Sequence, residues 1–322
     1  MKYSQQALNV LTALSFKGIG KAWIIKHQDV LSCKASLIDC LNLSTKDKLV
    51  SLCRFNDKQA AILSELIKRK DVIDGLTTIV DEDFPIHRGT VKNSQKPVAL
   101  FYQGDIRLLD PCKPSVAVIG LLDPDFSTEK SEISLVDELV SKNIIIVSGL
   151  ANGCDAIAHK QAVIKQGKTV AVLPSSLHNI LPRGNQSLAK EIVESGGLLV
   201  TEYMHDASSK LEFTARYQER DRLQALFSDA VILVASYAKN NQGNDSGARL
   251  AMEYALQYDI KRAVMYNISI DSRNPKYDLN RQLILKDTNI HVIKPEDTMC
   301  LAGNLLDKLI TEKSKNIQYS LF

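Results

Sequence analysis

The stretch that decides the fold reads Val147-Ser148-Gly149-Leu150-Ala151-Asn152-Gly153-Cys154-Asp155-Ala156-Ile157-Ala158-His159. An apolar run over residues 143–147 leads into it, and a helical pattern follows it. A strand, a glycine-containing turn and a helix start together present backbone N–H groups to an anion. The glycine spacing matches neither the G-x-G-x-x-G dinucleotide fingerprint nor the phosphate loop with its Lys and Ser/Thr. The stretch therefore predicts either a phosphate-binding turn or a plain strand-to-helix connection with Asp155 at the helix start.

Apolar runs alternate with amphipathic helical patterns on both sides of this stretch. The runs that follow Ser115 lie at residues 116–119, 143–147, 169–173, 198–201, 230–234 and 262–265. Continuous apolar runs suit parallel strands buried on both faces, and the helices between them form right-handed βαβ units. We predict an α/β fold with an extended Rossmann-like, doubly wound, mostly parallel sheet, preceded by a small helical domain. Ligands of such sheets bind at the carboxyl ends of the strands.

The pattern divides the chain into four segments. We expect a small helical domain over residues 1–75, a bridging segment over 76–114, the Rossmann-like domain over 115–311 and a tail over 312–322. In the first segment, Gly18-Ile19-Gly20-Lys21 interrupts a helical pattern, as in the phosphate-binding turn of a helix-hairpin-helix. The second hairpin of such a motif is missing, which favours a plain helical hairpin in a small bundle.

Composition limits the kinds of site and location that we expect. The formal net charge is only +3, so a nucleic-acid site has to be a local patch. The six cysteines form no C-x-x-C pair, which favours free thiols and predicts no metal site and no cofactor. The N-terminus lacks the apolar core of a signal peptide, and no run has the length of a membrane helix. We therefore expect a cytoplasmic protein with no membrane-bound part.

The letters S-G-L-A-x-G-x-D-x-x-A-H in the opening stretch resemble the signature of the DprA/Smf family of bacterial DNA-processing proteins. The resemblance continues through residues 171–174, 181–185, 197–203 and 217–229, and covers roughly residues 1–295. It implies a protein that binds single-stranded DNA and delivers it to a RecA-type recombinase during DNA uptake or recombination. It further implies a homodimer that binds DNA without catalysing a reaction. Many family members carry a winged-helix domain after the Rossmann part, and this chain resembles a variant without one.

The predicted DNA- or phosphate-binding residues lie at the carboxyl edge of the predicted sheet. They are Gly120, Ser148, Gly149, Asn152, Gly153, Arg183, Arg220, Arg222, Ser246 and Gly247, with Asp155, His159 and Asn185 as supporting residues. Arginine can hold a phosphate with two donors and can stack on bases. Salt bridges on a solvated helix are the alternative role for Arg220 and Arg222, and the family resemblance favours phosphate contact. Helical spacing turns Arg222 away from Arg220 by about 200°.

The glycines and the central histidine each leave two readings open. Gly149 and Gly153 either let the backbone approach a phosphate or only serve the turn. His159 is either a buried contact between helix and sheet or a phosphate donor. Cys154 is predicted to be a packing residue, because no adjacent base completes a nucleophilic pair in the sequence.

Several positions depart from the family pattern and leave a second function open. Leu121 follows Gly120 where the family has Ser and then Arg, Asn152 replaces an Arg, and Glu219 reverses the sign of another Arg. Each lost phosphate contact lowers the affinity for DNA and its dependence on salt. The alternative is a nucleotide-binding or nucleotide-hydrolysing Rossmann protein related to LOG-type enzymes, perhaps in defence signalling. The chain lacks the P-G-G motif of those enzymes, which makes hydrolysis the weaker part of this alternative.

The last five residues, Gln318-Tyr319-Ser320-Leu321-Phe322, resemble the peptide by which bacterial proteins dock on the replicative sliding clamp. Leu321 and Phe322 would fill an apolar pocket, and Gln318 would form a hydrogen bond at its rim. The alternative is an apolar tail folded onto its own helix. The position at the chain end favours docking, because chain ends are usually mobile unless they are tied down.

Overall fold

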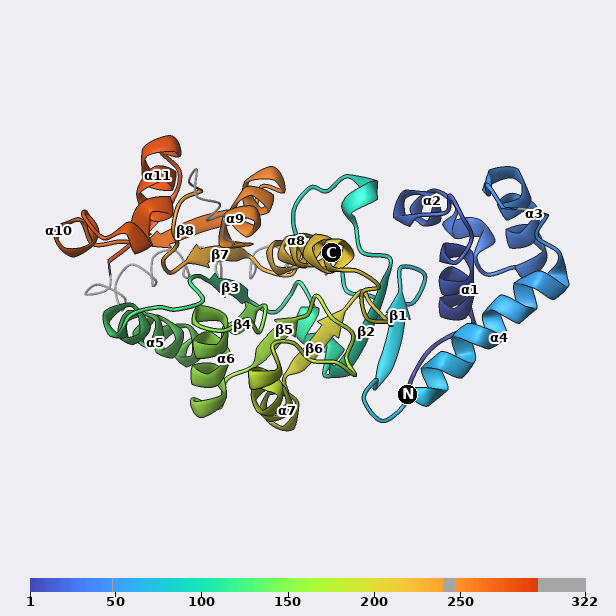
Figure 1. The fold of residues 1–322 in the computed structure, drawn as a ribbon, viewed down its shortest axis with the longest axis horizontal. Helices are drawn as coiled ribbons and strands as arrows, with labels where there is room; N and C mark the ends of the chain where they lie inside the picture. Colours follow the sequence, from blue (N-terminus) through green and yellow to red (C-terminus); the bar gives the residue numbers. More distant parts are fainter. Residues whose placement is uncertain (48, 240–246, 295–322) are drawn as a thin grey trace, which may run out of the picture.

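The computed structural model describes residues 1–47, 49–239 and 247–294. One nine-stranded sheet runs through it, with the strand order β1-β2-β6-β5-β4-β3-β7-β8-β9. Helices cover both faces of this sheet, and a group of N-terminal helices lies beyond the edge strand β1 (Figure 1). The predicted α/β class, with its helical segment ahead of a mostly parallel sheet, is confirmed.

The seven parallel strands arise from the apolar runs, most of which are buried along their whole length. Their bounds are β3 Ser115–Ile119, β4 Ile145–Ser148, β5 Thr169–Val172, β6 Leu198–Thr201, β7 Ala230–Leu233, β8 Lys261–Met265 and β9 His291–Ile293. Each neighbouring pair from β6 across to β9 is parallel. The carboxyl ends of these strands therefore meet along one edge, where the sequence places the site.

The bridging segment contributes two strands to the same sheet. β1 spans Gly75–Thr78 and β2 spans Ala99–Gly104, and they pair in antiparallel orientation. β2 also pairs in antiparallel orientation with β6. The segment predicted as a bridge thus extends the sheet at one edge, because its backbone finds its partners in β6, about a hundred residues further along the chain.

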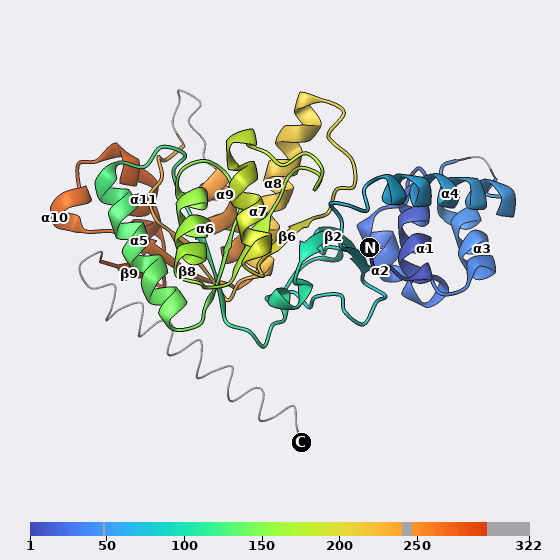
Figure 2. The same cartoon turned by 90° about the horizontal axis from the view of Figure 1, so that it is seen from below.

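Two sets of helices sandwich the sheet. One face carries α5 Phe126–Ser141, α6 Cys154–Ile164 and α7 Gln186–Glu194, which Figure 2 shows in front of the strands. The other face carries α8 Lys210–Leu226, α9 Gly247–Gln257 and α11 Asp278–Lys286 (Figure 1). The short helix α10 spans Ile268–Asp271. Each face has its own buried apolar cluster, which alternate side chains of the strands supply to the two sides.

The N-terminal helices form a small bundle with a core of its own. They are α1 Gln5–Leu14, α2 Lys21–Lys26, α3 Lys34–Ser44 and α4 Leu52–Lys68. Phe16, Ile24, Leu37, Leu41 and Phe55 are buried together at the centre of the bundle. The predicted interruption at Gly18 lies between α1 and α2, where Gly18 adopts a φ of 90° that favours glycine.

Short 3₁₀ turns connect these elements. They are η1 Gln28–Val30, η2 Asn93–Gln95, η3 Ile106–Leu109, η4 Arg183–Asn185 and η5 Pro275–Tyr277. Among the described helices, none has the length and apolar character that a membrane crossing requires. Three predicted parts lie outside the described residues. They are residues 295–311 at the end of the predicted Rossmann-like domain, the tail with Gln318, Leu321 and Phe322, and the predicted site residue Ser246.

Candidate nucleic-acid interface

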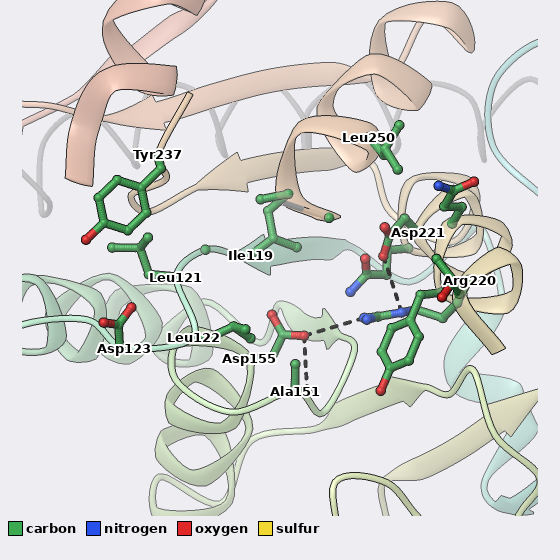
Figure 3. A pocket seen from close by; sticks show the side chains of 17 residues that line it. Ile119, Leu121, Leu122, Asp123, Ala151, Asp155, Arg220, Asp221, Tyr237 and Leu250 are labelled. Carbon is green, nitrogen blue, oxygen red and sulfur yellow. Dashed lines mark hydrogen bonds and ion pairs between the residues drawn. The ribbon is translucent and has the colours of Figure 1, made fainter. Parts of the chain in front are cut away.

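The turn between β4 and α6 is filled by a carboxylate of its own chain. Asp155 Oδ2 accepts hydrogen bonds from the backbone N–H groups of Gly149 at 3.2 Å and Ala151 at 3.3 Å. Arg220 Nη1 lies 3.4 Å from the same oxygen (Figure 3). These N–H groups are the ones that the sequence predicts for a phosphate, and an internal anion already holds them. Asp155 does more than start the helix, because it closes the turn and places Arg220 against it.

The two glycines of the turn are required by contacts within the protein. A Cβ on Gly149 would lie 1.1 Å from Arg220 Nη1, so the guanidinium packs directly against this residue. Gly153 has a φ of 72°, and a Cβ there would lie 2.2 Å from the backbone oxygen of Leu121. The expectation that these glycines make room for a phosphate is therefore corrected. The space that a Cβ would take at each glycine is occupied by atoms of the protein.

Two further predicted residues are packed into the same region. Ser148 is buried, and its hydroxyl donates to the backbone oxygen of Val118 at 2.7 Å. Gly120 lies so close to Cys154 that a Cβ would come within 2.6 Å of its Sγ. The serine hydroxyl thus donates its proton within the protein, and phosphate binding by Ser148 stays a prediction.

Asn185, predicted as a supporting residue, lies beside the turn between β4 and α6. Its side-chain Nδ2 donates to the backbone oxygens of Leu150 at 2.9 Å and Ala151 at 3.2 Å. It thereby ties η4 to the turn between β4 and α6. Arg183, in the same 3₁₀ turn, is exposed and forms no ion pair with the described residues. Asn152 is exposed at the tip of the turn.

His159 and Cys154 lie in the core below the turn. His159 is fully buried, and its Nδ1 shares a 2.7 Å hydrogen bond with Thr169 Oγ1. Burial, helped by the charge of Arg220, lowers the pKa of this histidine to about 3. It is therefore an uncharged contact between helix and sheet, and the alternative of a phosphate donor is wrong. Burial also raises the pKa of the Cys154 thiol far above its usual range, as expected for a packing residue.

The arginines of α8 point in different directions because the whole segment is one helix. Ser209 caps it by accepting a hydrogen bond from the backbone of Glu212 at 3.2 Å. Arg220 lies 3.4 Å from Asp155 and 3.3 Å from the neighbouring Asp221. Arg222, on another face, lies 2.6 Å from Glu202 at the end of β6. Both arginines are buried, so neither is the solvated helix residue that the alternative reading described.

A cavity of about 620 Å³ opens at this edge of the sheet (Figure 3). The end of β3, the turn before α6, one face of α8 and the start of α9 form its walls. Among the described residues, its charged lining consists of Asp123, Asp155 and Asp221 and the cation Arg220. Burial raises the pKa of Asp221 to about 7, an effect that the guanidinium of Arg220 opposes. The cavity is therefore acidic, whereas the sequence predicts a basic phosphate site.

Two aromatic side chains and one glycine also line this cavity. Tyr217 from α8 and Tyr237 after β7 line it. Gly247 begins α9, and a Cβ there would lie 3.0 Å from Asp221 Oδ2. Sequence reasoning missed Asp221, Asp123 and both tyrosines. The signal for Asp221 was its position between two arginines, which was read only as a possible surface salt bridge.

The chain was compared with known proteins. The family model of DNA recombination-mediator protein A matches residues 75–297. Protein Smf of Escherichia coli K12 is 31% identical over 157 residues, which cover 49% of this chain and 40% of that protein. DNA processing protein DprA of Streptococcus pneumoniae is 31% identical over 180 residues, which cover 56% of this chain and 58% of that protein. These matches thus span about half the length of each of these two relatives.

Two solved structures resemble the model. The structure of DNA processing protein A from Streptococcus pneumoniae has a TM-score of 0.68 at 22% identity, and the match covers 93% of this chain and 98% of that chain. The structure reported for the single-stranded DNA binding mode of DNA processing protein A from Helicobacter pylori has a TM-score of 0.56 at 27% identity. That match covers 72% of this chain and 96% of the other chain. The first similarity confirms the fold, including the N-terminal helices.

Proposed function

The chain belongs to the DNA recombination-mediator protein A family, and we propose that it binds single-stranded DNA and loads a RecA-type recombinase onto it. The Helicobacter pylori relative has a single-stranded DNA binding mode. The observation that carries the proposal for this chain is the 620 Å³ cavity at the carboxyl edge of the sheet. Ligands of doubly wound sheets bind at this edge. Tyr217 and Tyr237 supply aromatic surface there, on which bases stack irrespective of sequence.

We expect the cavity and the surface around it to contact different parts of a DNA strand, because they differ in charge. Among the described residues of its lining, Arg220 neutralises Asp155, and Asp123 and Asp221 leave a net negative charge, which favours an uncharged base over a phosphate. Phosphates are expected outside the cavity, near the exposed Arg183 in η4, which Asn185 ties to the turn between β4 and α6. Contacts of Arg220 and Arg222 with phosphates stay predictions, and they require the ion pairs with Asp155 and Glu202 to open. Loss of basic contacts inside the cavity predicts a modest salt dependence of binding.

A binding role without catalysis is part of the proposal. Cys154 and His159 are both fully buried, and neither has the exposure or the protonation behaviour of a nucleophile with its base. Homodimer formation and docking on the replicative sliding clamp through Gln318, Leu321 and Phe322 are further parts of the proposal. We place the protein in the cytoplasm, where a recombinase and its DNA are found.

One observation favours a second candidate function. The acidic cavity suits the amino groups of a free nucleotide base at least as well as it suits a DNA strand. A nucleotide-binding role related to LOG-type proteins is therefore the alternative, with the nucleotide as a signal.

Fluorescence anisotropy with a labelled oligonucleotide, titrated at several salt concentrations, separates the two functions. Single-strand binding predicts a micromolar or tighter Kd. The logarithm of this Kd should rise linearly with the logarithm of the salt concentration. The alternative predicts no strand binding, together with a rise in melting temperature when a mononucleotide is added. Strand binding that is absent at low salt would refute the proposed function.

A further inference from the structure

A second cavity lies on another face of α8, where α2, η2 and α9 approach this helix. It measures about 500 Å³, and its walls include Gly20, Trp23, Glu219, Arg222 and Tyr254. A Cβ built on Gly20 meets no atom within 4 Å, so the cavity is open at this residue. Of the DNA-binding residues predicted from the sequence, this cavity contains only Arg222.

Two side chains in the wall of this cavity carry N–H groups that lack a partner. Arg222 is 3% exposed, and its Nη2 is held by Glu202 at 2.6 Å. Its Nη1 has no hydrogen-bond acceptor among the described residues, and neither does the buried Nε1 of Trp23. A donor that is removed from water without a partner is unfavourable. Both atoms are closed to solvent in this conformation, so an acceptor in the cavity reaches them once the side chains in its wall shift.

The charges around the cavity indicate which chemical group that acceptor belongs to. Lys21 Nζ lies 3.0 Å from Glu202 Oε1 and 3.3 Å from Glu219 Oε2. With Arg222 on the other oxygen of Glu202, two cations face two carboxylates. The network is neutral, so a phosphate gains no net attraction from it.

An uncharged group with acceptor atoms suits this network better. Trp23 and Tyr254 add aromatic surface to the wall, and aromatic side chains are what single-stranded bases stack on. A nucleobase combines both properties, because it is flat and carries carbonyl oxygens or ring nitrogens along one edge.

We propose that the second cavity binds a nucleobase of the same DNA strand, whose acceptor edge pairs with Arg222 and Trp23. This inference rests on the proposed single-strand binding and adds a second contact to it. α8 carries walls of both cavities, with Arg220 on one face and Arg222 on another. A strand that crosses this helix can therefore place one base in each cavity.

The single tryptophan of the chain makes the proposal directly testable, because that residue is Trp23. The full chain is titrated with a labelled oligothymidylate. Anisotropy of the label reports strand binding, and tryptophan emission reports the second cavity. We expect both signals to change over the same concentration range.

The variant Gly20→Leu fills the open space of the cavity, and Gly20→Ala is its matched control at the same position. Gly20→Leu should remove the emission change and weaken strand binding by roughly 5- to 150-fold, the range expected for one stacked base. Gly20→Ala should retain both signals. Equal behaviour of the two folded variants, with emission still responding to DNA, would overturn the proposal.

Two further ligands, an abasic oligonucleotide and free thymidine, identify what the cavity binds. An abasic oligonucleotide keeps every phosphate, and an equal emission change with it would overturn the assignment of a base. Free thymidine acting at the same concentration as the strand would assign the cavity to a free nucleoside instead. Strand binding by anisotropy without any emission change would refute the second cavity alone. Absence of strand binding by both signals would refute the proposed function and this inference with it.

Discussion

At the scale of single residues, the arginines differ in what they can do. Arg220 and Arg222 neutralise buried carboxylates, and removing one partner of a buried ion pair costs about 3–5 kcal/mol. Alanine at either position would therefore test the stability of the fold more than DNA contact. Arg183 is exposed and unpaired among the described residues, which makes it the informative position.

We expect Arg183→Ala to weaken single-strand binding for all sequences alike and to reduce the salt slope by about one unit. The reason is the loss of one phosphate contact on η4. Arg107 is a suitable control, because it is exposed in η3, which precedes the amino end of β3. Binding isotherms at several salt concentrations measure both variants. If Arg183→Ala and Arg107→Ala show the same salt dependence of DNA binding, Arg183 does not contact the DNA.

A second residue, Glu132 on α5, predicts how stability depends on pH. Its side chain is fully buried, and neither carboxyl oxygen has a hydrogen-bond partner among the described residues; the thiol of Cys154, a weak donor, interacts with it. Burial raises the pKa of Glu132 well above its ordinary value. The folded state therefore keeps a proton that the unfolded state releases above pH 4.5, so the free energy of unfolding falls as pH rises through the neutral range.

Glu132→Gln should abolish this contribution, because glutamine has nearly the same shape and no titrating proton. We expect the variant to match the wild type near pH 4 and to be more stable at pH 8. Glu129→Gln on the exposed side of the same helix is the control. Urea unfolding across this pH range tests the prediction, and identical pH slopes for Glu132→Gln and the wild type would contradict it.

At the scale of elements, the turn between β4 and α6 depends on the loop after β3. The backbone N–H of Cys154 donates to the oxygen of Leu121 at 2.9 Å, and Gly153 packs against the same oxygen. The two connections therefore form one unit at the carboxyl edge. A change in either connection alters the wall of the cavity that both of them line.

Gly153→Val should destabilise the fold and weaken DNA binding together. The positive φ costs about 1–3 kcal/mol for a residue with a side chain, and the clash with Leu121 adds to this. Gly184→Val is the control, since a Cβ there meets nothing within 4 Å. Urea unfolding measures the effect. If Gly153→Val unfolds like the wild type and still loses DNA binding, the glycine serves a ligand, as the sequence first suggested.

At the scale of the whole molecule, the N-terminal helices are tied to the sheet by charge. Lys21 on α2 bridges Glu202 at the end of β6 and Glu219 on α8. Glu219 also accepts a hydrogen bond from the hydroxyl of Tyr203 at 3.0 Å. The reversed sign at residue 219, which the sequence marked as a lost phosphate contact, thus has a partner in the N-terminal helices. This residue links two parts of the molecule.

The chain end belongs to the same scale, because its predicted role is to connect the molecule to a larger assembly. A synthetic peptide of residues 313–322 should bind purified replicative clamp in the micromolar range. The double substitution Leu321→Ala and Phe322→Ala should remove this binding, since these side chains supply the apolar contact. Surface plasmon resonance with the intact protein is the measurement. No clamp binding by the intact protein would reject the prediction.

The sequence by itself determined the parallel sheet and the position of its ligand edge. Continuous apolar runs such as residues 116–119 and 230–234 have to be buried on both faces, and their order along the chain leaves few topologies. The opening stretch was likewise readable as strand, turn and helix, because that information is local.

Only the tertiary structure decided what occupies the edge. Asp155 fills its own turn, and its cation comes from Arg220, 65 residues further along the chain. Lys21, which lines the second cavity together with Arg222, pairs with Glu202, 181 residues further along the chain. Local patterns report which residues can carry charge. Which charges neutralise one another depends on contacts between distant segments, and these contacts made an expected phosphate site acidic.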